Sequence, residues 1–249
     1  MMDTENKALV QYLYHSGFAL ELDQYFIIFD YYKSYPESIK ESIKNRISRC
    51  RYPIVLASHS HYDHFNPEIF QWKEYNPNIT YILSDDINDV QSSRAGGFNL
   101  IYMRPYEKKE VNNAVISTYG STDLGVSFAI DINGLRIFHA GDLNWWHWAD
   151  ESTEEELAEE EDKFKTEVSK IDIKTFDIMF FPVDPRLGEY YWLGGAYMLE
   201  NFHPGLFVPM HFADNTGVTG KFAERMTGLG VQIAVIDHAG QVFEYRKHK

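Results

Sequence analysis

Short apolar and aromatic runs alternate with polar breaks along the first third of the chain. Runs rich in Val, Ile, Tyr and Phe predict strands over 8–14, 18–22 and 25–29. Isoleucines spaced by four residues then predict a helix from Pro36 to about Ser48. The continuous apolar run Pro53–Ala57 is typical of a strand buried on both faces.

The rest of the chain continues this alternation of strands and helices. Asn66 and Pro67 have the pattern of an N-cap and a first helical residue, and they predict a short helix that ends near Tyr75. The acidic run from Asp150 to Asp162 predicts a helix with a solvated face. Further apolar runs predict strands over 79–83, 100–103, 111–117, 126–132, 135–138, 178–181, 206–208 and 231–236.

The order of elements is therefore strand-rich, mixed, strand-rich and mixed again. No repeat and no Pro/Ser-rich linker divides the chain, and 249 residues lie near the upper end of the usual size of one domain. We therefore expect a single α/β domain over residues 1–249. Two sheets packed face to face, with helices outside, would accommodate the pattern.

Charge and cysteine content limit the expected partners and the compartment. The chain has 23 Lys and Arg against 37 Asp and Glu, a formal net charge of −14, which repels phosphate backbones and anionic lipid. Nucleic acid and membrane are therefore not expected as partners, and no block of Lys and Arg suggests a basic groove. A single cysteine, Cys50, and an N-terminus (residues 1–6) without a signal-peptide pattern predict a cytoplasmic protein.

The segment from Ser58 to His64 carries the strongest chemical signal. It follows the apolar run 53–57 directly and contains the pattern H-x-H-x-D-H, formed by His59, His61, Asp63 and His64. Imidazole and carboxylate groups suit Zn²⁺, Fe or Mn²⁺, and four of them at the end of one strand can converge on a small volume. The pattern predicts a metal site.

Two later segments offer further ligands at the ends of other predicted strands. Asp142 follows Phe138-His139-Ala140-Gly141, and His211 follows Val208-Pro209-Met210. Either residue alone would be weak evidence, because an Asp after Gly is usually a turn and a lone His is usually structural. Together with the first motif, they are the complements that a closed metal site needs.

With these motifs, the sequence resembles the metallo-β-lactamase-fold hydrolases. Residues 14–17 (YHSG) and 28–30 (IFD) extend the resemblance over nearly the whole chain. The branch that it resembles most contains ascorbate-6-phosphate lactonase and N-acyl-phosphatidylethanolamine phospholipase D. The resemblance implies a four-layer αβ/βα sandwich, with two mixed sheets, outer helices and a one- or two-metal site at one edge of the sheets.

The resemblance also assigns roles to the ligands. His59 and His61 would bind a first metal, Asp63 and His64 a second. Asp142 would bridge both metals, and His211 would complete the second site.

One expected ligand of the first metal is absent. The family normally supplies another histidine just before the strand that begins near Gly125, and this chain has no histidine between Thr118 and Asp123. Asp123 or Ser121 could substitute as an oxygen donor and favour a harder metal such as Mn²⁺. Alternatively, water fills the gap, or only the second metal binds tightly. Zn²⁺ is the expected cofactor, as one or two ions, with Mn²⁺ or Fe as alternatives.

Such a site performs hydrolysis with a metal-bound hydroxide, because a metal lowers the pKa of bound water from 15.7 toward about 7. Asp63 and Asp142 are the candidate catalytic residues, because either could also orient the attacking water. No G-x-S-x-G pattern supports a covalent serine mechanism.

Four residues are candidates for contact with substrate. Trp145 and Trp146 either form a wall of the site or pack beneath the acidic helix. Arg186 either holds a phosphate or carboxylate or pairs with Asp184 or Glu189. His15 is a candidate pocket residue or outer partner of a metal ligand.

The leading hypothesis is a hydrolase of a small, anionic molecule, such as a phosphorylated lactone, an ester or a phosphodiester. The alternatives are a nuclease of the same fold, which the charge of −14 disfavours, and a metal-binding protein without catalysis, which the missing histidine suggests. A di-iron redox centre is a lesser variant. A homo-oligomer stays an open alternative.

Overall fold

The computed structural model describes residues 7–33, 36–87, 97 and 99–247. The chain divides into two compact units, one formed by residues 1–103 and 237–249 and the other by residues 104–236. The expectation of one domain over 1–249 stays a prediction. Residues 1–6, in which no signal-peptide pattern was found, lie outside the described residues.

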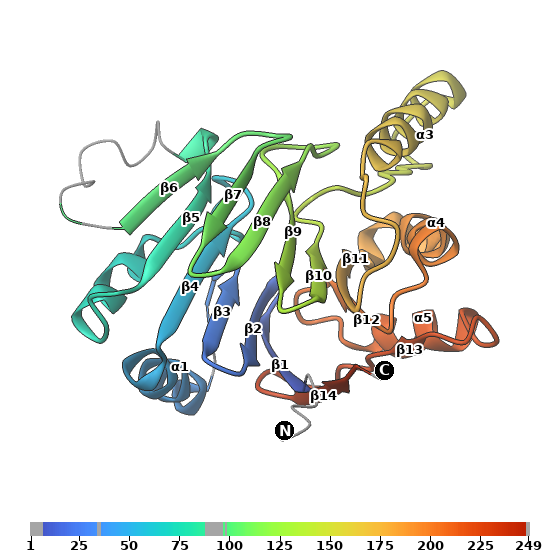
Figure 1. Ribbon diagram of the computed structural model, residues 1–249. Coiled ribbons are helices and arrows are strands. Elements are labelled where there is room, and N and C mark those ends of the chain that lie inside the picture. The colour runs from blue at the N-terminus through green and yellow to red at the C-terminus, as the bar shows by residue number, and fades with distance from the viewer. Residues whose placement is uncertain (1–6, 34–35, 88–96, 98, 248–249) are drawn as a thin grey trace. The chain divides into compact units, whose positions relative to one another are not determined.

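A mixed sheet of seven strands forms the first unit, in the order β14-β1-β2-β3-β4-β5-β6 (Figure 1). Strands β14, β1, β2 and β3 pair antiparallel, and strands β3 to β6 pair parallel. The strands are β1 (Lys7–Tyr14), β2 (Gly17–Leu22), β3 (Tyr25–Phe29), β4 (Tyr52–Ala57), β5 (Thr80–Ser84), β6 (Asn99–Met103) and β14 (Val242–Arg246).

Helix α1 and a 3₁₀ helix accompany this sheet within the described residues. Helix α1 (Glu37–Arg49) buries Ile39, Ile43 and Ile47 in one apolar cluster with residues of β3, β4 and β5, as the four-residue spacing predicts. The segment predicted as a short helix is a 3₁₀ helix, η1 (Pro67–Glu74), which begins where the side chain of Asn66 accepts a hydrogen bond from the backbone of Glu68.

The second unit contains another mixed sheet of seven strands, in the order β13-β12-β11-β10-β9-β8-β7. Strands β7 to β10 pair antiparallel, and β10 to β13 run parallel. The strands are β7 (Lys108–Val111), β8 (Ala114–Tyr119), β9 (Ser127–Ile132), β10 (Leu135–His139), β11 (Ile178–Pro182), β12 (Leu206–Met210) and β13 (Gln232–Ile233).

Helices pack on this second sheet through aromatic contacts. Phe164 of α3 (Glu154–Ser169) lies against Phe181 of β11, and Phe222 of α5 (Gly217–Arg225) stacks on Phe207 of β12 at 5.1 Å. Helix α4 (Leu193–Phe202) and the 3₁₀ segment η2 (Pro185–Tyr190) complete the unit. The acidic run is solvated as expected, and its helix begins at a capping box formed by Thr153 and Glu156.

Two predicted strands differ from the observed ones, and one observed strand was not predicted. The strand predicted over 111–117 is a hairpin, β7 and β8, which turns at Asn112 and Asn113, both at positive φ. Such a turn needs two residues that tolerate a left-handed backbone, and asparagine is one of the few. The strand predicted over 231–236 is only the two-residue β13. Strand β14 was not predicted, because it forms through pairing with the distant β1.

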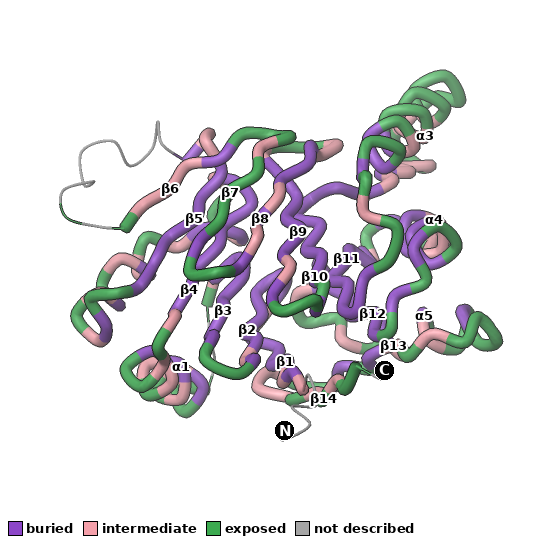
Figure 2. The backbone as a smooth tube through the Cα atoms, viewed as in Figure 1, coloured by how far each residue is buried: buried purple, intermediate pink, exposed green. Residues whose placement is uncertain are grey.

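The parallel strands bring polar residues to one edge of each sheet. Strands β3, β5, β11 and β12 are buried along their whole length (Figure 2). In the first unit, Asp30 and the Ser58–His64 loop follow the paired ends of β3 and β4. In the second unit, Asp142, Asp184 and His211 follow β10, β11 and β12. Carboxyl ends of parallel strands are where open α/β sheets place their functional groups.

Across the described part of the chain, none of the helices has the length and apolar character needed to cross a bilayer.

Candidate metal centre

The loop after β4 gathers three imidazole rings in the first unit. His59 and His64 are fully buried, and their ring centroids lie 4.1 Å apart. The ring of His61 stands edge-on to His59 at 4.6 Å, and the backbone of His64 and Phe65 donates hydrogen bonds to the carbonyl of His61. The loop therefore turns back on itself and brings the histidines of H-x-H-x-D-H together.

The carboxylate of Asp30 fixes the orientation of this loop. Asp30 is fully buried at a positive φ of 40°, and its Oδ1 accepts a 2.7 Å hydrogen bond from the backbone of Ser58. Its Oδ2 accepts one from Ser58 Oγ at 2.7 Å and lies 2.8 Å from Nδ1 of His64. Because Nδ1 of His64 is held by Asp30, Nε2 is the nitrogen that this ring presents to a metal.

His59 is oriented by the same network. Its Nδ1 lies 3.0 Å from Ser58 Oγ, and its Nε2 lies 3.0 Å from Nδ1 of His61. Two nitrogens bound to one zinc at about 2.0–2.1 Å are about 2.8–3.4 Å apart for bond angles of about 90–110°. The observed spacing therefore fits two imidazoles that share one cation.

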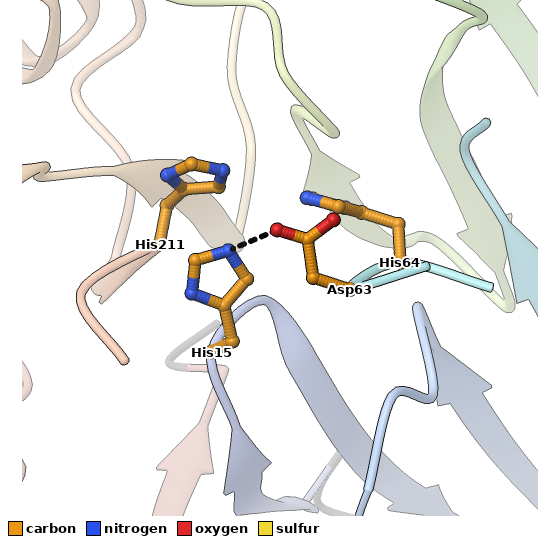
Figure 3. Close-up of side chains that lie close together, drawn as sticks. All are labelled: His15, Asp63, His64 and His211. Atoms are coloured by element: carbon orange, nitrogen blue, oxygen red, sulfur yellow. Dashed lines mark ion pairs between the residues drawn. The ribbon is translucent and has the colours of Figure 1, made fainter. Parts of the chain in front are cut away.

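The remaining carboxylate of the motif lies beside His15. Nε2 of His15 is 3.5 Å from Oδ2 of Asp63, and the His15 ring stands edge-on to His64 at 5.5 Å (Figure 3). The backbone N–H of His15 donates to the hydroxyl of Tyr12 at 2.9 Å. His15 is thus placed against two predicted ligands of its own unit.

The second unit holds its predicted ligands in a similar way. Nδ1 of His211 lies 2.9 Å from Oδ2 of Asp184, and Nε2 lies 3.3 Å from Oδ1 of Asp142. All three side chains are buried. Asp184 therefore holds Nδ1 of His211 as Asp30 holds Nδ1 of His64. In both rings, Nε2 is the nitrogen left for a metal.

Electrostatics at His211 favour positive charge. Burial lowers the pKa of this imidazole, but the carboxylates of Asp142 and Asp184 outweigh burial and raise the pKa to about 10. Burial raises the pKa of Asp184, whereas its contacts with His211 and Arg186 lower that pKa to about 2. A place that stabilises an imidazolium between two carboxylates also suits a divalent cation, which binds once the imidazole is neutral.

Arg186 completes the support of Asp184. Its Nε lies 3.0 and 2.9 Å from the two oxygens of Asp184, and its Nη2 lies 2.5 Å from Oδ2. This is the ion pair that the sequence offered as the alternative to substrate binding. The guanidinium also lies over the ring of Trp148, and its side chain is 61% exposed.

The two candidate tryptophans occupy different surroundings. Trp146 is buried, donates from Nε1 to the carbonyl of Asp142 at 3.1 Å and packs edge-on against His211 at 5.5 Å. Trp145 stacks instead on Phe164 of α3, with Lys165 over its ring. The structure therefore places Trp146 against the candidate ligands and Trp145 beneath the acidic helix.

The segment that lacks the expected histidine is tied to the loop that carries Asp142. Thr122 Oγ1 donates to the carbonyl of Asn144 at 2.7 Å, and the backbone of Asn144 donates back at 2.9 Å. Ser121 Oγ accepts from the backbone of Asp123 at 3.2 Å. Ser121 and Asp123, the candidate replacement ligands, flank Thr122. Thr122 therefore holds their segment against the loop that carries Asp142, within the second unit.

Each unit therefore presents a donor set that fits a metal. The first contributes His59, His61, Asp63 and His64, and the second contributes Asp142 and His211. Nitrogen and carboxylate oxygen are the donors that zinc and related divalent ions accept, and carboxylates that hold the far ring nitrogens are their usual outer partners.

Sequence reasoning assigned no role to Asp30 or Ser58 and treated Asp184 only as a partner of Arg186. Asp30 lies 28 positions before Ser58, so no local spacing links them. Asp30 directly follows an apolar strand, as Asp184 does one residue later, and this position is the signal that could have identified both.

Comparison with known proteins identifies the family. Residues 9–211 match the family described as "Beta-lactamase superfamily domain", so the chain belongs to this superfamily. As a member, it is classed with the metal-dependent hydrolases of the metallo-β-lactamase type.

Similar solved structures agree on the fold. Igni18, a metallo hydrolase from Ignicoccus hospitalis, is 15% identical with a TM-score of 0.63, and the match covers 98% of this chain and 100% of that one. YhfI from Bacillus subtilis is 12% identical with a TM-score of 0.63 over 96% and 99%. CmlA, a diiron β-hydroxylase from Streptomyces venezuelae, is 11% identical with a TM-score of 0.63 over 98% and 55%. The chain therefore has the metallo-β-lactamase fold that the motifs predicted.

Proposed function

We propose that this protein is a metal-dependent hydrolase with ligands from the H-x-H-x-D-H loop and from the segments that carry Asp142 and His211. The ligands would be His59, His61, Asp63, His64, Asp142 and His211. The observation that carries the proposal is the pair of anchored imidazoles: Asp30 holds Nδ1 of His64, and Asp184 holds Nδ1 of His211. The family match from residue 9 to residue 211 spans the ligands of both units.

When bound, a divalent metal would supply a water of lowered pKa and a Lewis acid for a carbonyl or phosphoryl oxygen. The protein's own part is to hold the imidazoles in one tautomer and to place carboxylates beside the attacking water. Asp63 and Asp142 are the carboxylates that could orient that water and accept its proton. Trp146 would exclude bulk water on the side of His211.

The proposed centre contains two ions, with zinc as the expected metal and Mn²⁺ or Fe as alternatives. Asp123 or Ser121 would supply an oxygen where the family has a histidine, and the clamp between Thr122 and Asn144 supports a fixed position for this loop. An oxygen ligand would favour a harder metal at the first position. Metal counting on the purified protein tests this, because a firm stoichiometry of one per chain would contradict a two-metal centre.

The proposed substrate is a small anionic molecule, such as a phosphorylated lactone, an ester or a phosphodiester. The resemblance to the ascorbate-6-phosphate lactonase branch supports this class. A panel of phosphorylated lactones, carboxylic esters and phosphodiesters would identify the preferred bond.

Substitution of one ligand from each unit tests the proposal. We expect His61→Ala and Asp142→Ala each to abolish hydrolysis of the best panel substrate while the protein stays folded by circular dichroism. His238→Ala is the matched control, because His238 is exposed and outside the proposed ligand set. Full activity in both ligand variants would reject the assignment.

A non-catalytic metal-binding protein is the second candidate, and the absence of histidine between Thr118 and Asp123 favours it. It predicts tight metal binding without turnover. Stoichiometric metal together with no hydrolysis across the whole panel would support this alternative against the enzyme.

A further inference from the structure

A separate cleft lies in the first unit, between the end of α1 and the hairpin that joins β2 to β3. Its volume is about 420 Å³, which is within the range of small-molecule sites. Tyr25 and Phe26 form its apolar floor, and three arginines, Arg46, Arg49 and Arg51, line it.

This cleft is at the opposite end of its strands from the predicted metal ligands. Tyr25 and Arg51 lie at or just before the starts of β3 and β4, whereas Asp30 and Ser58 follow the ends of the same strands. A strand of five or six residues spans about 17–20 Å. The cleft is therefore distinct from the candidate metal centre.

The charge of the cleft differs from that of the molecule. Arg46 is committed to Glu21, from which Nε is 2.8 Å away, and to Gln11 at 3.0 Å, and its guanidinium covers the ring of Phe26. Arg49 and Arg51 are exposed, and Asp23 is the only acidic residue of the lining besides Glu21. The lining therefore has a net positive charge in a chain whose formal charge is −14.

Helix stability explains only part of this cluster. Basic residues in the last turn of a helix interact favourably with its dipole, which accounts for Arg46 and Arg49. Arg51 lies beyond the helix, where it is held by a 2.9 Å hydrogen bond from Nη1 to Gln24 Oε1. The stability of α1 therefore requires neither an arginine at position 51 nor an apolar floor beneath it.

We propose that this cleft binds a flat organic anion, a phosphate or carboxylate joined to a ring. Arg49 and Arg51 hold the anionic group by charge-assisted hydrogen bonds, and the ring lies against Tyr25 and the Arg46 guanidinium that covers Phe26. Arg46, which is held by Glu21, forms the wall between the apolar floor and the two exposed arginines, Arg49 and Arg51, which we call the rim.

The only cysteine of the chain provides a reporter inside the cleft. Cys50 lines it, and its Sγ donates to the carbonyl of Gln24 at 3.1 Å. Neutral iodoacetamide alkylates this thiol as the thiolate displaces iodide, so the rate at fixed pH measures access to the cleft. This readout is independent of hydrolysis and of metal content.

The test uses three probes that separate ring from anion: adenosine 5′-monophosphate, adenosine and inorganic phosphate. The monophosphate should slow alkylation saturably, by about tenfold at roughly ten times its Kd. Adenosine alone and phosphate alone should protect far more weakly. A monophosphate effect no larger than that of sodium chloride at equal ionic strength would overturn the proposal.

Substitution of the rim distinguishes binding at this cleft from binding elsewhere. Both arginines are exposed, so the double variant Arg49→Gln/Arg51→Gln should fold normally and lose the protection. Arg225→Gln is the matched control, because Arg225 is also an exposed arginine in the last turn of a helix. Protection that persists in the double variant, with both proteins folded, would contradict the assignment.

Discussion

Two buried carboxylates, Asp30 and Asp184, perform the same task in the two units. Each follows a parallel strand, and each lies within 2.9 Å of Nδ1 of a histidine that is a predicted metal ligand. A neutral imidazole has one donor and one acceptor nitrogen, so a carboxylate at Nδ1 fixes the tautomer that leaves the Nε2 lone pair for a metal. Ligand geometry is therefore decided by residues outside the metal-binding motif.

Asp30→Asn is the sharpest test of this role. Asparagine keeps the size and tolerates the positive φ, but its amide has one accepting oxygen, so it cannot accept both from the backbone of Ser58 at Oδ1 and from Ser58 Oγ and His64 at Oδ2. We expect metal affinity to fall by about 10–100-fold, as measured by competition with a chromophoric chelator.

Asp177→Asn is the matched control for that variant. Asp177 is also a buried carboxylate that accepts a backbone hydrogen bond, from Arg136 at 2.8 Å, but it precedes β11, at the end of that strand opposite to Asp184. The substitution Asp177→Asn should lower the free energy of unfolding and leave metal affinity unchanged. Equal loss of affinity in the two variants would show that general destabilisation, and not the orientation of His64, is responsible.

The sequence predicted the ligands themselves because they are dense and chemically distinctive. His59, His61, Asp63 and His64 lie within six consecutive positions, and so dense a cluster of metal-binding side chains seldom occurs by chance. Asp30 could not be paired with His64 in this way, because the contact joins residues 34 positions apart. Long-range contacts of this kind depend on the register between β3 and β4, which only the fold defines.

At the scale of elements, local signals were sufficient wherever an element is stabilised by its own residues. The isoleucine spacing of α1 and the cap at Asn66 both predicted what the structure shows. Strand β14 has no such signal, because its residues alternate between exposed and half-buried and its partner is β1. Strand β14 therefore forms by pairing with the edge of β1, which lies near the opposite end of the chain.

The capping box of α3 should make a measurable contribution to stability. The side chain of Thr153 accepts from the backbone of Glu156, and the Glu156 carboxylate accepts from the backbone of Thr153 at 2.8 Å. Thr153→Ala should lower the free energy of unfolding by about 1 kcal/mol in urea titrations. Thr166→Ala on the exposed face of the same helix should be neutral or slightly stabilising, and an equal loss there would contradict a capping effect.

A glycine sets the close approach of α4 to the loop that carries Asp142. A Cβ on Gly194 would collide with Oδ1 of Asn144 and would also lie 3.2 Å from the backbone of Trp145. Gly194→Ala should therefore displace this loop, lower stability and weaken metal binding. Its control, Gly220→Ala in α5, meets only Val235 at 3.9 Å and should stabilise by roughly 0.5–1 kcal/mol. Thermal unfolding and chelator competition on both variants measure these effects.

At the scale of the whole molecule, the proposed metal binding should raise the stability of the folded chain. A ligand that binds only the folded protein stabilises it by about 2.7 kcal/mol at roughly 100 times its Kd. For a chain of this size, that corresponds to a rise in Tm of roughly 5–10 °C. Zinc added to metal-stripped protein should produce such a shift, measured by scanning calorimetry.

If the proposed ligands bind the metal together, the shift in Tm must depend on each of them. His61→Ala removes a ligand of the first unit and His211→Ala one of the second, and either should abolish most of the rise in Tm. His238→Ala should keep it, because an exposed histidine outside the ligand set contributes nothing to the bound state. A ligand variant that retained the full shift would show that the substituted histidine does not bind the metal, and the proposed ligand set would be wrong.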